Sequence, residues 1–381
     1  MIRVLLVGKF PPVEGGIASK CWQLTRALRP HGIVFHGVGI TMPSEYCTPA
    51  DDINSSLLST HWIAQQDSTM PWFLPGGDLL VERLSAIALD IAREFRPNIV
   101  EANYLAPYGI VASWVARQLG VPLLLRHAGS DMAKLLSRTD LYAAFSALLH
   151  AAQAVVTTED GRFVDSYPDL ATVSWRIIPR YAPDPKLFHF TCRKSSRTTP
   201  PTLLYIGKSN FHWKLRALEL AAQAVAKTEG WRLKLITNGK GLANVQHVLA
   251  DYALGDRLSY HDFIPPSSVP AQLRTAAAVW GFNRLGGVSD VSNVIWEAAA
   301  CGVPVLCSRT EYLPEECAIL QPWLHAVDDE AESVATCLKA LRDMPVLEHD
   351  KWKYTVHQRY MAYVDAQLVL YRNLAESCDD V

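Results

Sequence analysis

The sequence predicts an α/β protein of two doubly wound domains, each built on a parallel sheet with helices on both faces. Three observations lead to this prediction. The length of 381 residues exceeds what a single hydrophobic core usually supports. Short β-branched segments alternate with longer amphipathic ones, as in parallel strands joined by helices. A polar segment with a proline pair interrupts this alternation at residues 191–201, after which the pattern begins again.

In the first half, five short apolar runs are predicted to be strands of one sheet. They are residues 4–7, 33–38, 98–100, 122–125 and 154–157, with helical patterns at 78–95 and 109–119 between them. The stretch 41–77 is long for a connection in such a fold, and long connections are often functional. It contains Trp62, for which packing under the loop and binding of a ligand are both open interpretations.

The second half repeats the alternation. Strand-like runs at 203–206, 232–236, 258–261, 278–281 and 304–307 alternate with helical patterns near 214–228, 241–254, 267–276 and 292–301. An aromatic-rich helical pattern follows over 350–377. We therefore expect an N-terminal domain over 1–188, a linker at 189–201, a C-terminal domain over 202–348, and a C-terminal helix within 349–381 that packs back on the first domain.

Composition and charge narrow the classes of function. The formal charge of −2 gives no overall attraction to nucleic acid, so no nucleic acid partner is expected. The eight cysteines lie far apart without a C-x-x-C pair, which favours reduced thiols in a cytoplasmic protein. No window approaches the roughly twenty apolar residues of a membrane span, so any membrane contact is expected to be peripheral, at the inner face of the membrane.

Two glycines, Gly15 and Gly16, separate the first predicted strand from the helical pattern that follows it. Glycines at a helix N-terminus let an anion approach backbone N–H groups, and the helix dipole favours negative charge there. A tight strand–helix turn without a ligand is the alternative. A second pair, Gly239 and Gly241, lacks the third glycine of a dinucleotide fingerprint, and we interpret it as a turn.

The most specific run is Ser292-Asn293-Val294-Ile295-Trp296-Glu297-Ala298-Ala299-Ala300-Cys301-Gly302-Val303-Pro304-Val305-Leu306. It reads as a helix that a polar pair opens and Gly302 ends, with a carboxylate about one turn in. Backbone donors at Asn293 and Val294 can hold a phosphate, while Glu297 can accept the two hydroxyls of a ribose. The alternative is a salt bridge of Glu297 at a domain surface, but a lone acid in so apolar a helix favours a ligand.

This run resembles the signature of the group-1, family-4 retaining glycosyltransferases, whose fold of two facing Rossmann-like domains is called GT-B. Residues 289–305 match most of a string like E-x-F-P-N-V-x-x-E-A-M-A-x-G-x-P-V. The resemblance implies that Glu297 binds the donor ribose. The first glutamate of the string is replaced by Ser289, with Asp290 beside it. Both are assigned to the sugar end of the donor site, where Asp290 substitutes for the glutamate if the loop shifts by one residue.

Other segments resemble the same family in the same order along the chain. They are Phe10-Pro11-Pro12 with Gly15-Gly16, and residues 97–103, 120–123, 127–131 and 178–188. The resemblance implies that the Gly15-Gly16 loop binds the donor phosphates and that His127 lies beside the transferred sugar. A core histidine bonded to the backbone is the alternative for His127. Trp62 and Asp131 are assigned to the acceptor, which the first domain is expected to bind.

In the second half, Lys208 and Lys214 look like the basic pair of this family, spaced one residue wider than is common. Two cations from different loops can neutralise a diphosphate, which makes the nucleotide a better leaving group. Solvated surface lysines are the alternative. The Gly286-Gly287 loop is expected to face the donor sugar, with N–H groups that bind hydroxyls or phosphate.

Together these residues predict a retaining glycosyltransferase that moves a sugar from a nucleotide-diphosphate donor to an acceptor hydroxyl. Lys208, Lys214 and His127 are assigned to catalysis. No D-x-D metal motif is found in the sequence, so neither a metal nor another cofactor is expected beside the donor substrate. The resemblance implies an oligosaccharide, lipid-linked or small-molecule acceptor, in polysaccharide, lipopolysaccharide or glycolipid assembly. A sugar-nucleotide epimerase of the same fold and a catalytically silent nucleotide-sugar-binding protein are the alternatives.

Overall fold

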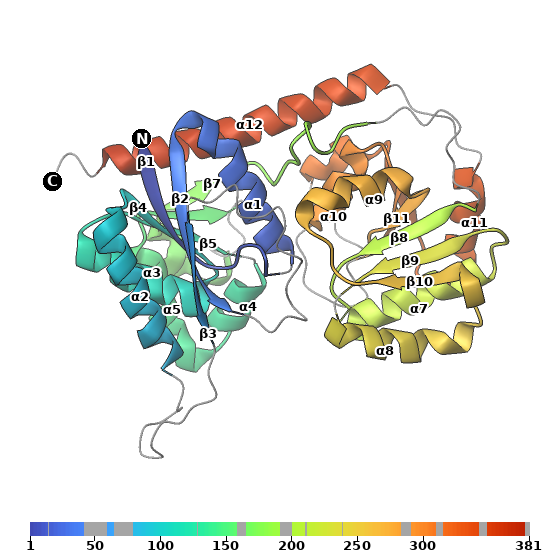
Figure 1. Cartoon of the computed structure of the whole chain (residues 1–381), viewed down its shortest axis with the longest axis horizontal. Helices are drawn as coiled ribbons and strands as arrows, with labels where there is room; N and C mark the ends of the chain where they lie inside the picture. The colour runs from blue at the N-terminus through green and yellow to red at the C-terminus, as the bar shows by residue number, and fades with distance from the viewer. Residues whose placement is uncertain are drawn as a thin grey trace, which may run out of the picture.

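The computed structural model describes residues 1–13, 15–41, 59–64, 79–127, 129–157, 165–190, 200–209, 212–237, 239–282, 291–309, 315–342 and 349–377. Within these residues two parallel sheets form the centres of two domains, and one long helix lies along the first domain and reaches the edge of the second (Figure 1). The predicted α/β class with two doubly wound domains is therefore confirmed.

The first domain contains a seven-stranded sheet in the order β3-β2-β1-β4-β5-β6-β7. Its strands are β1 (Ile2–Val7), β2 (Ile33–Thr41), β3 (Ser59–Ala64), β4 (Ile99–Asn103), β5 (Leu123–Arg126), β6 (Ala154–Thr157) and β7 (Trp175–Ile177). All neighbouring strands are parallel. The order reverses at β1, which pairs with β2 on one side and with β4 on the other.

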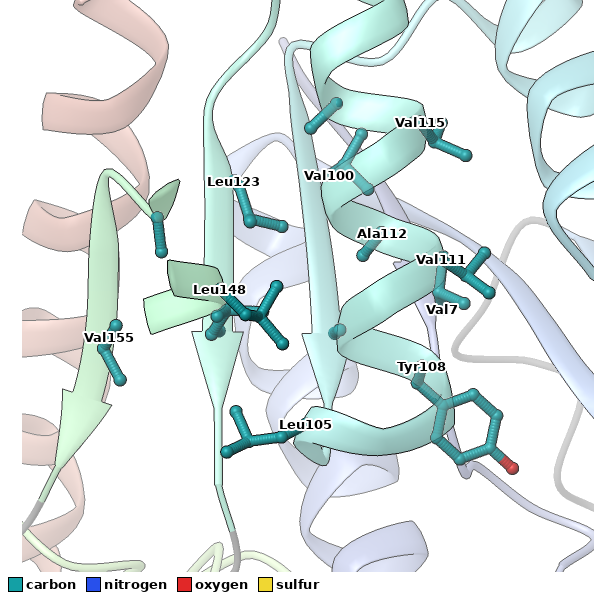
Figure 2. Close-up of a cluster of buried hydrophobic side chains, with 14 of the residues drawn as sticks. Val7, Val100, Leu105, Tyr108, Val111, Ala112, Val115, Leu123, Leu148 and Val155 are labelled. Atoms are coloured by element: carbon teal, nitrogen blue, oxygen red, sulfur yellow. The ribbon is translucent and has the colours of Figure 1, made fainter. Parts of the chain in front are cut away.

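Helices cover both faces of this sheet. One face packs against α2 (Leu80–Phe95), α3 (Ile110–Leu119), α4 (Ser130–Leu136) and α5 (Thr139–Ala151), and the other against α1 (Gly16–Leu28). Figure 2 shows the first interface, where Val111 and Val115 of α3 lie in one buried cluster with Val7 of β1 and Val100 of β4. These side chains are buried because alternate residues of a parallel strand face the two helical layers.

The second domain contains a six-stranded parallel sheet in the order β10-β9-β8-β11-β12-β13. Its strands are β8 (Thr202–Ile206), β9 (Arg232–Ile236), β10 (Leu258–His261), β11 (Ala278–Trp280), β12 (Val305–Ser308) and β13 (Leu324–Val327). One face packs against α7 (His212–Ala226), α8 (Gly239–Leu249) and α11 (Ala331–Arg342). The other packs against α9 (Val269–Thr275) and α10 (Asn293–Ala300).

The last helix, α12 (His349–Glu376), connects the two domains (Figure 1). Near its start, Nε1 of Trp352 donates a hydrogen bond of 2.7 Å to the carbonyl oxygen of Ala299 in α10. Near its end, Gln367 accepts a hydrogen bond of 2.8 Å from the Arg126 guanidinium in the first domain. The predicted C-terminal helix that packs back on the first domain is thus confirmed.

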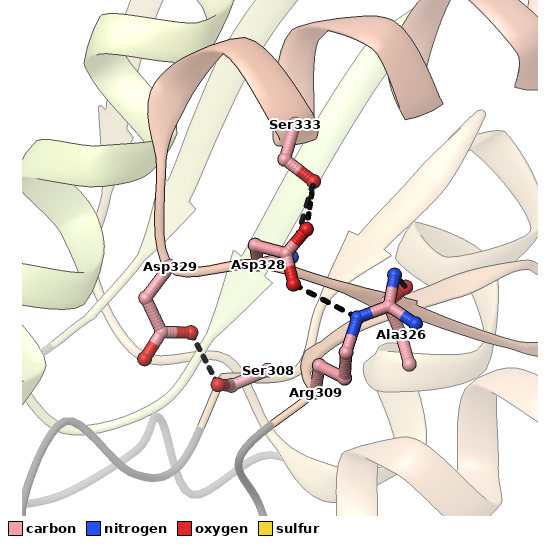
Figure 3. Close-up of polar contacts among 6 residues, drawn as sticks. All are labelled: Ser308, Arg309, Ala326, Asp328, Asp329 and Ser333. Atoms are coloured by element: carbon pink, nitrogen blue, oxygen red, sulfur yellow. Dashed lines mark hydrogen bonds and ion pairs between the residues drawn. The ribbon is translucent and has the colours of Figure 1, made fainter.

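Polar contacts join the carboxyl ends of β12 and β13 to the start of α11 (Figure 3). Ser308 donates to Asp329, and Nε of Arg309 donates to Asp328 at 2.8 Å. The backbone N–H of Asp328 donates to Ser333 in the first turn of α11 at 3.1 Å. Because the carboxyl ends of parallel strands share one edge of a sheet, these contacts brace the same edge from which the loop after β8 emerges.

All ten strands predicted from the sequence are present, and β3, β7 and β13 are additional. These three are edge strands of their sheets. An edge strand is covered less completely than a central one, so its apolar run is weaker, and among the four edge strands of the described sheets only β10 was predicted. The treatment of 41–77 as one long connection is wrong, because β3 divides it. Trp62 lies in β3, in register with Gly39 of β2.

The interpretation of Gly239 and Gly241 as a turn is also wrong. Helix α8 begins at Gly239, so both glycines lie in its first turn. Further along α8, Val245 and Leu249 are buried in the core. Their burial outweighs the loss of roughly 1 kcal/mol per glycine in helix propensity.

Candidate functional site

In each sheet the strand order reverses at one point, and the loops that follow these two points meet at the interface between the domains. The order reverses between β1 and β4 in the first sheet and between β8 and β11 in the second. Ligands of open α/β sheets bind outside the carboxyl ends of the strands at such points. The loop after β1 leads to Gly15 and the loop after β8 carries Lys208. These two residues meet, because a Cβ atom at Gly15 would lie 3.1 Å from Cε of Lys208. The interface between the domains therefore has the topology of a ligand site.

The Gly15-Gly16 pair opens helix α1 at this interface. Gly15 has φ +117° and ψ 166°, a conformation that is essentially restricted to glycine. Gly16 is the first residue of α1, whose leading N–H groups have no acceptor within the helix. Nδ2 of Asn293 donates a hydrogen bond of 2.9 Å to the carbonyl oxygen of Gly16. The N-termini of α1 and α10, one from each domain, therefore lie beside each other.

Helix α10 begins with Asn293 and Val294. Their backbone N–H groups are at the first two positions of the helix, where no intrahelical acceptor exists. The side chain of Val294 is buried in the core of the second domain. The helix ends at Ala300, and Gly302, two residues later, has φ +71°, the left-handed conformation expected after a helix.

Lys208 and Lys214 are near neighbours in space. Lys214 lies in the first turn of α7 and is half-buried. Burial lowers its pKa to about 8, and the positive charge of Lys208 adds to this effect. Within the part of the chain that the structure describes, no carboxylate forms an ion pair with Lys214. Two adjacent like charges in such a setting favour a site for an anion.

Hydrogen bonds hold the loop that carries Lys208. The Tyr205 hydroxyl donates to the carbonyl oxygen of Lys208 at 2.6 Å. The Thr237 hydroxyl, at the end of β9, donates to the Ser209 hydroxyl at 2.7 Å, and both of these side chains are fully buried. These bonds fix the backbone of the loop at Lys208 to the strands beneath it.

Glu297 is 5% exposed and makes contacts outside its own domain. Its Oε1 atom accepts hydrogen bonds from the Tyr181 hydroxyl at 2.9 Å and from Nε2 of Gln23 at 3.3 Å. Burial raises the pKa of Glu297 to about 7, while the bonds from Tyr181 and Gln23 and the charge of Lys20 act in the opposite direction. A salt bridge at the domain surface, the alternative from the sequence, is wrong, because the carboxylate is buried and its bonded partners are neutral.

The sequence did not point to Gln23 or Tyr181. One signal was available, since Gln23 interrupts the otherwise apolar neighbours Trp22 and Leu24 on α1, and all three side chains are buried. A buried amide needs a hydrogen-bonding partner. The identity of that partner, 274 residues later in the chain, could not be inferred from local pattern.

His127 and Asp131 follow β5 at the carboxyl edge of the first sheet. The backbone N–H of Gly129 donates to Nδ1 of His127 at 3.1 Å, so in the neutral ring the proton is on Nε2. The ring meets Trp175 edge-on, with the two ring centroids 6.4 Å apart. Asp131 accepts a hydrogen bond of 3.1 Å from the backbone N–H of Leu105, so its carboxylate supports the turn after β4.

Four residues assigned to the donor site lie outside the described residues, namely Gly286, Gly287, Ser289 and Asp290. The side chain of Trp62 lies outside them as well. The roles assigned to these five residues stay predictions.

The same described residues also bear on metal ions and on membranes. There, no group of three or more His, Cys, Asp and Glu side chains is arranged to hold a metal ion. None of the helices described combines the length and the apolar character needed to cross a membrane.

Residues 200–343 match the family model for glycosyl transferases group 1. A comparison with curated proteins gives no match. Among solved structures, sucrose-phosphate synthase from Thermosynechococcus elongatus has a TM-score of 0.69 at 17% identity, over 99% of this chain and 100% of that chain. The HepE protein of Anabaena, in complex with UDP and glucose, has a TM-score of 0.66 at 12% identity over the whole of both chains.

A third structure, described as trehalose-6-phosphate from E. coli bound with UDP-2-fluoro glucose, has a TM-score of 0.63 at 14% identity, over 98% of this chain and 99% of that chain. At such identities the likeness concerns the fold. The chain therefore has the two-domain GT-B fold, and its second domain carries the sequence pattern of the glycosyl transferases group 1.

Proposed function

We propose that the protein transfers a sugar from a nucleotide-diphosphate donor to an acceptor hydroxyl, with retention of configuration at the anomeric carbon. The observation that carries the proposal is the meeting of Lys208, the Lys214 beside it and the helix N-terminus at Gly15-Gly16. Lysine ammonium groups and unbonded N–H groups of a helix are the partners that a diphosphate prefers.

Glu297 supplies the second part of the donor site. It lies about one turn after Asn293 on α10, so a phosphate at the helix N-terminus and a ribose near Glu297 are at the spacing of one nucleotide. The Anabaena and E. coli neighbours were solved with UDP and with UDP-2-fluoro glucose, respectively. UDP is therefore the first nucleotide to test.

The chemistry follows from the charge that develops on the leaving group. The bond between the anomeric carbon and the phosphate oxygen breaks, and a bond from that carbon to the acceptor oxygen forms on the same face of the sugar. Lys208 and Lys214 stabilise the negative charge that appears on the diphosphate. The leaving phosphate oxygen takes the proton of the acceptor hydroxyl, so no side chain has to act as a strong base. In this scheme His127 bonds the hydroxyls of the transferred sugar, and no step uses a metal ion.

The acceptor and the setting rest on the family resemblance. The proposal is an oligosaccharide, a lipid-linked or a small-molecule acceptor, bound by the first domain near His127 and Asp131. Such a reaction would contribute to polysaccharide, lipopolysaccharide or glycolipid assembly in the cytoplasm, including at the inner face of the membrane.

A thermal-shift screen with UDP, GDP and ADP tests the proposal. A diphosphate at 100 times its dissociation constant stabilises a protein by about 2.7 kcal/mol, which raises Tm by several degrees. We expect one of the three to do so, and we expect Glu297→Ala to abolish most of the shift. If no nucleotide stabilises the parent, or if Glu297→Ala responds like the parent, the proposal is wrong.

A second assay separates transfer from the two alternatives. The matching nucleotide sugar is incubated with and without a mixture of acceptors, and free diphosphate and the donor sugar are measured. Transfer requires release of diphosphate that depends on the acceptor. Conversion of the donor sugar without acceptor would instead identify an epimerase. A protein that binds the donor but is silent with every acceptor, and that gains activity on Ser289→Glu, would be a binding protein that lacks the first glutamate.

A further inference from the structure

The two oxygens of the Glu297 carboxylate differ in their hydrogen bonds. Both hydrogen bonds, from Tyr181 at 2.9 Å and from Gln23 at 3.3 Å, go to Oε1. Among the described residues, no donor reaches Oε2. All three side chains are almost fully buried, with exposed fractions of 5 to 6%. One oxygen of the carboxylate is therefore fixed by the protein, and the other is left to accept bonds from elsewhere.

Neither partner of Oε1 belongs to the second domain. Gln23 lies on α1, the helix whose N-terminus meets Lys208. Tyr181 lies in the segment after β7, and its ring meets Tyr363 of α12 edge-on, with centroids 6.4 Å apart. The orientation of Glu297 within its own domain is thus set by α1 and by the segment after β7 that contains Tyr181.

Gln23 also contacts the chain where it leaves the first domain. Its Oε1 atom accepts the backbone N–H of Asp184 at 3.5 Å, while its Nε2 donates to Glu297. A side-chain amide has one acceptor oxygen and one donor nitrogen, and this arrangement uses both. Since a buried amide is satisfied only when both bonds are made, Gln23 favours one relative position of α1, the backbone at Asp184 and α10.

We propose that Gln23 and Tyr181 are positioning residues for the nucleotide: they hold Oε1 of Glu297 so that Oε2 is presented to the ribose, and they make recognition of the ribose depend on the first domain. This inference rests on the proposed function, in which Glu297 accepts the ribose hydroxyls. It assigns no contact with the nucleotide to Gln23 or Tyr181 themselves. Their effect is therefore confined to the part of the ligand that Glu297 binds.

Gln23 and Tyr181 should therefore affect binding of the ribose but not binding of the phosphates. Calorimetry measures the dissociation constants of UDP, 2′-deoxy-UDP and inorganic pyrophosphate. The proteins are the parent, Gln23→Leu and Tyr181→Phe. GDP and ADP, each with its 2′-deoxy form, are measured in parallel. The parent should prefer UDP over its deoxy form by on the order of tenfold, as for one hydrogen bond to a charged acceptor. In both variants the ratio of the two dissociation constants, 2′-deoxy-UDP over UDP, should fall towards one. The affinity for pyrophosphate, which engages only the lysines and helix N-termini, should not change.

Two further variants test whether the change in ribose preference acts through Glu297. Tyr252→Phe removes a hydroxyl that accepts a hydrogen bond from Gln223 on α7, away from the site, and it should leave all ratios as in the parent. In the Glu297→Gln background, Gln23→Leu should have no additional effect on the ratio, because the carboxylate on which it acts is gone.

The possible failures are distinguishable. If the parent binds none of UDP, GDP and ADP, the proposed function is wrong and the inference falls with it. If the parent discriminates against the deoxy form and both variants do so equally well, only the inference is overturned. Parallel loss of affinity for UDP and for pyrophosphate in Tyr181→Phe, which deletes a single oxygen atom, would also overturn it, since that pattern indicates a general loss of domain packing.

Discussion

The side-chain amide of Asn293 donates a hydrogen bond of 2.9 Å to the carbonyl oxygen of Gly16, 277 positions away in the chain. This bond joins the first residue of α10 to the first residue of α1. Two helix N-termini that belong to different domains are thereby brought to one place, where both dipoles favour negative charge. The five predictions below concern this place and the helix that ties the domains together.

Gly15→Ala is expected to lower both the stability and the affinity for a nucleoside diphosphate. Its φ of +117° is strained for alanine, at about 1–3 kcal/mol, and the new Cβ would lie 3.1 Å from Cε of Lys208. The displaced lysine should reduce affinity by on the order of tenfold. Gly32→Ala is the matched control, because Gly32 has φ +78° with no atom within 4 Å of the added Cβ. It should cost stability alone. Urea unfolding and calorimetry measure the two effects, and equal affinities in the two variants would contradict the prediction.

Lys214→Met is expected to separate binding from stability. The free protein should be as stable as the parent or more so, because the substitution removes a half-buried charge that faces the charge of Lys208. Affinity for the diphosphate should fall by about 10- to 100-fold, as for a lost charge-assisted hydrogen bond. Lys227→Met, directly after α7, replaces an exposed lysine paired with Glu332 and should change neither quantity much. A clear drop in the Tm of free Lys214→Met would count against an anion site.

The affinity for the donor is expected to follow a bell-shaped pH curve. Glu297 has a pKa of about 7 and accepts both ribose hydroxyls only when ionised, so affinity should rise as the pH approaches 7. Lys214 has a pKa of about 8 and attracts the diphosphate only when protonated, so affinity should fall above pH 8. Calorimetry with UDP-glucose, whose diphosphate does not titrate in this range, measures the curve. Glu297→Gln should remove the acidic limb and Lys214→Met the alkaline limb, and a flat curve in the parent would contradict both assignments.

The raised pKa of Glu297 also affects folding, with a definite sign. Because the folded-state pKa exceeds the ordinary value of 4.5, the stabilisation linked to this group is fully present below pH 4.5 and is lost as the pH rises through 7. The free energy of unfolding of Glu297→Gln should therefore depend less on pH in this window than that of the parent, as measured by urea unfolding. The opposite ordering would show that the folded-state pKa is not raised.

Tyr371→Phe is expected to weaken the attachment of α12 to the first domain. The Tyr371 hydroxyl donates to the buried Glu101 and accepts a bond of 3.2 Å from Arg126, which itself pairs with Glu101 at 2.7 Å. Loss of the hydroxyl leaves buried charged groups with one partner fewer, so we expect a destabilisation of roughly 1–3 kcal/mol. Tyr354→Phe on the same helix is the control, since Tyr354 is 66% exposed and should stay within about 0.5 kcal/mol of the parent. Indistinguishable urea midpoints for the two variants would refute the prediction.

Some features of the fold were predictable because they depend on local pattern. Central strands of a parallel sheet are buried on both faces, so segments such as residues 4–7 and 203–206 appear as apolar runs. The helix that starts at Asn293 and ends before Gly302 was predictable because a polar start and a glycine end leave a local signature. Three of the four edge strands of the described sheets, β13 among them, were missed because one side of an edge strand is not paired and its pattern is weaker, while the edge strand β10 was predicted.

The chain by itself determined the residue types of the site: glycines where β1 gives way to a helix, lysines after β8 and at the start of α7, and one acid in an apolar helix. Tertiary structure alone decided that Lys208 meets Gly15 and that Gln23 and Tyr181 hold one oxygen of Glu297. The physical reason is the range of the forces. Strand and helix patterns arise from neighbours along the chain, whereas a buried carboxylate selects its partners by proximity after the two domains have packed.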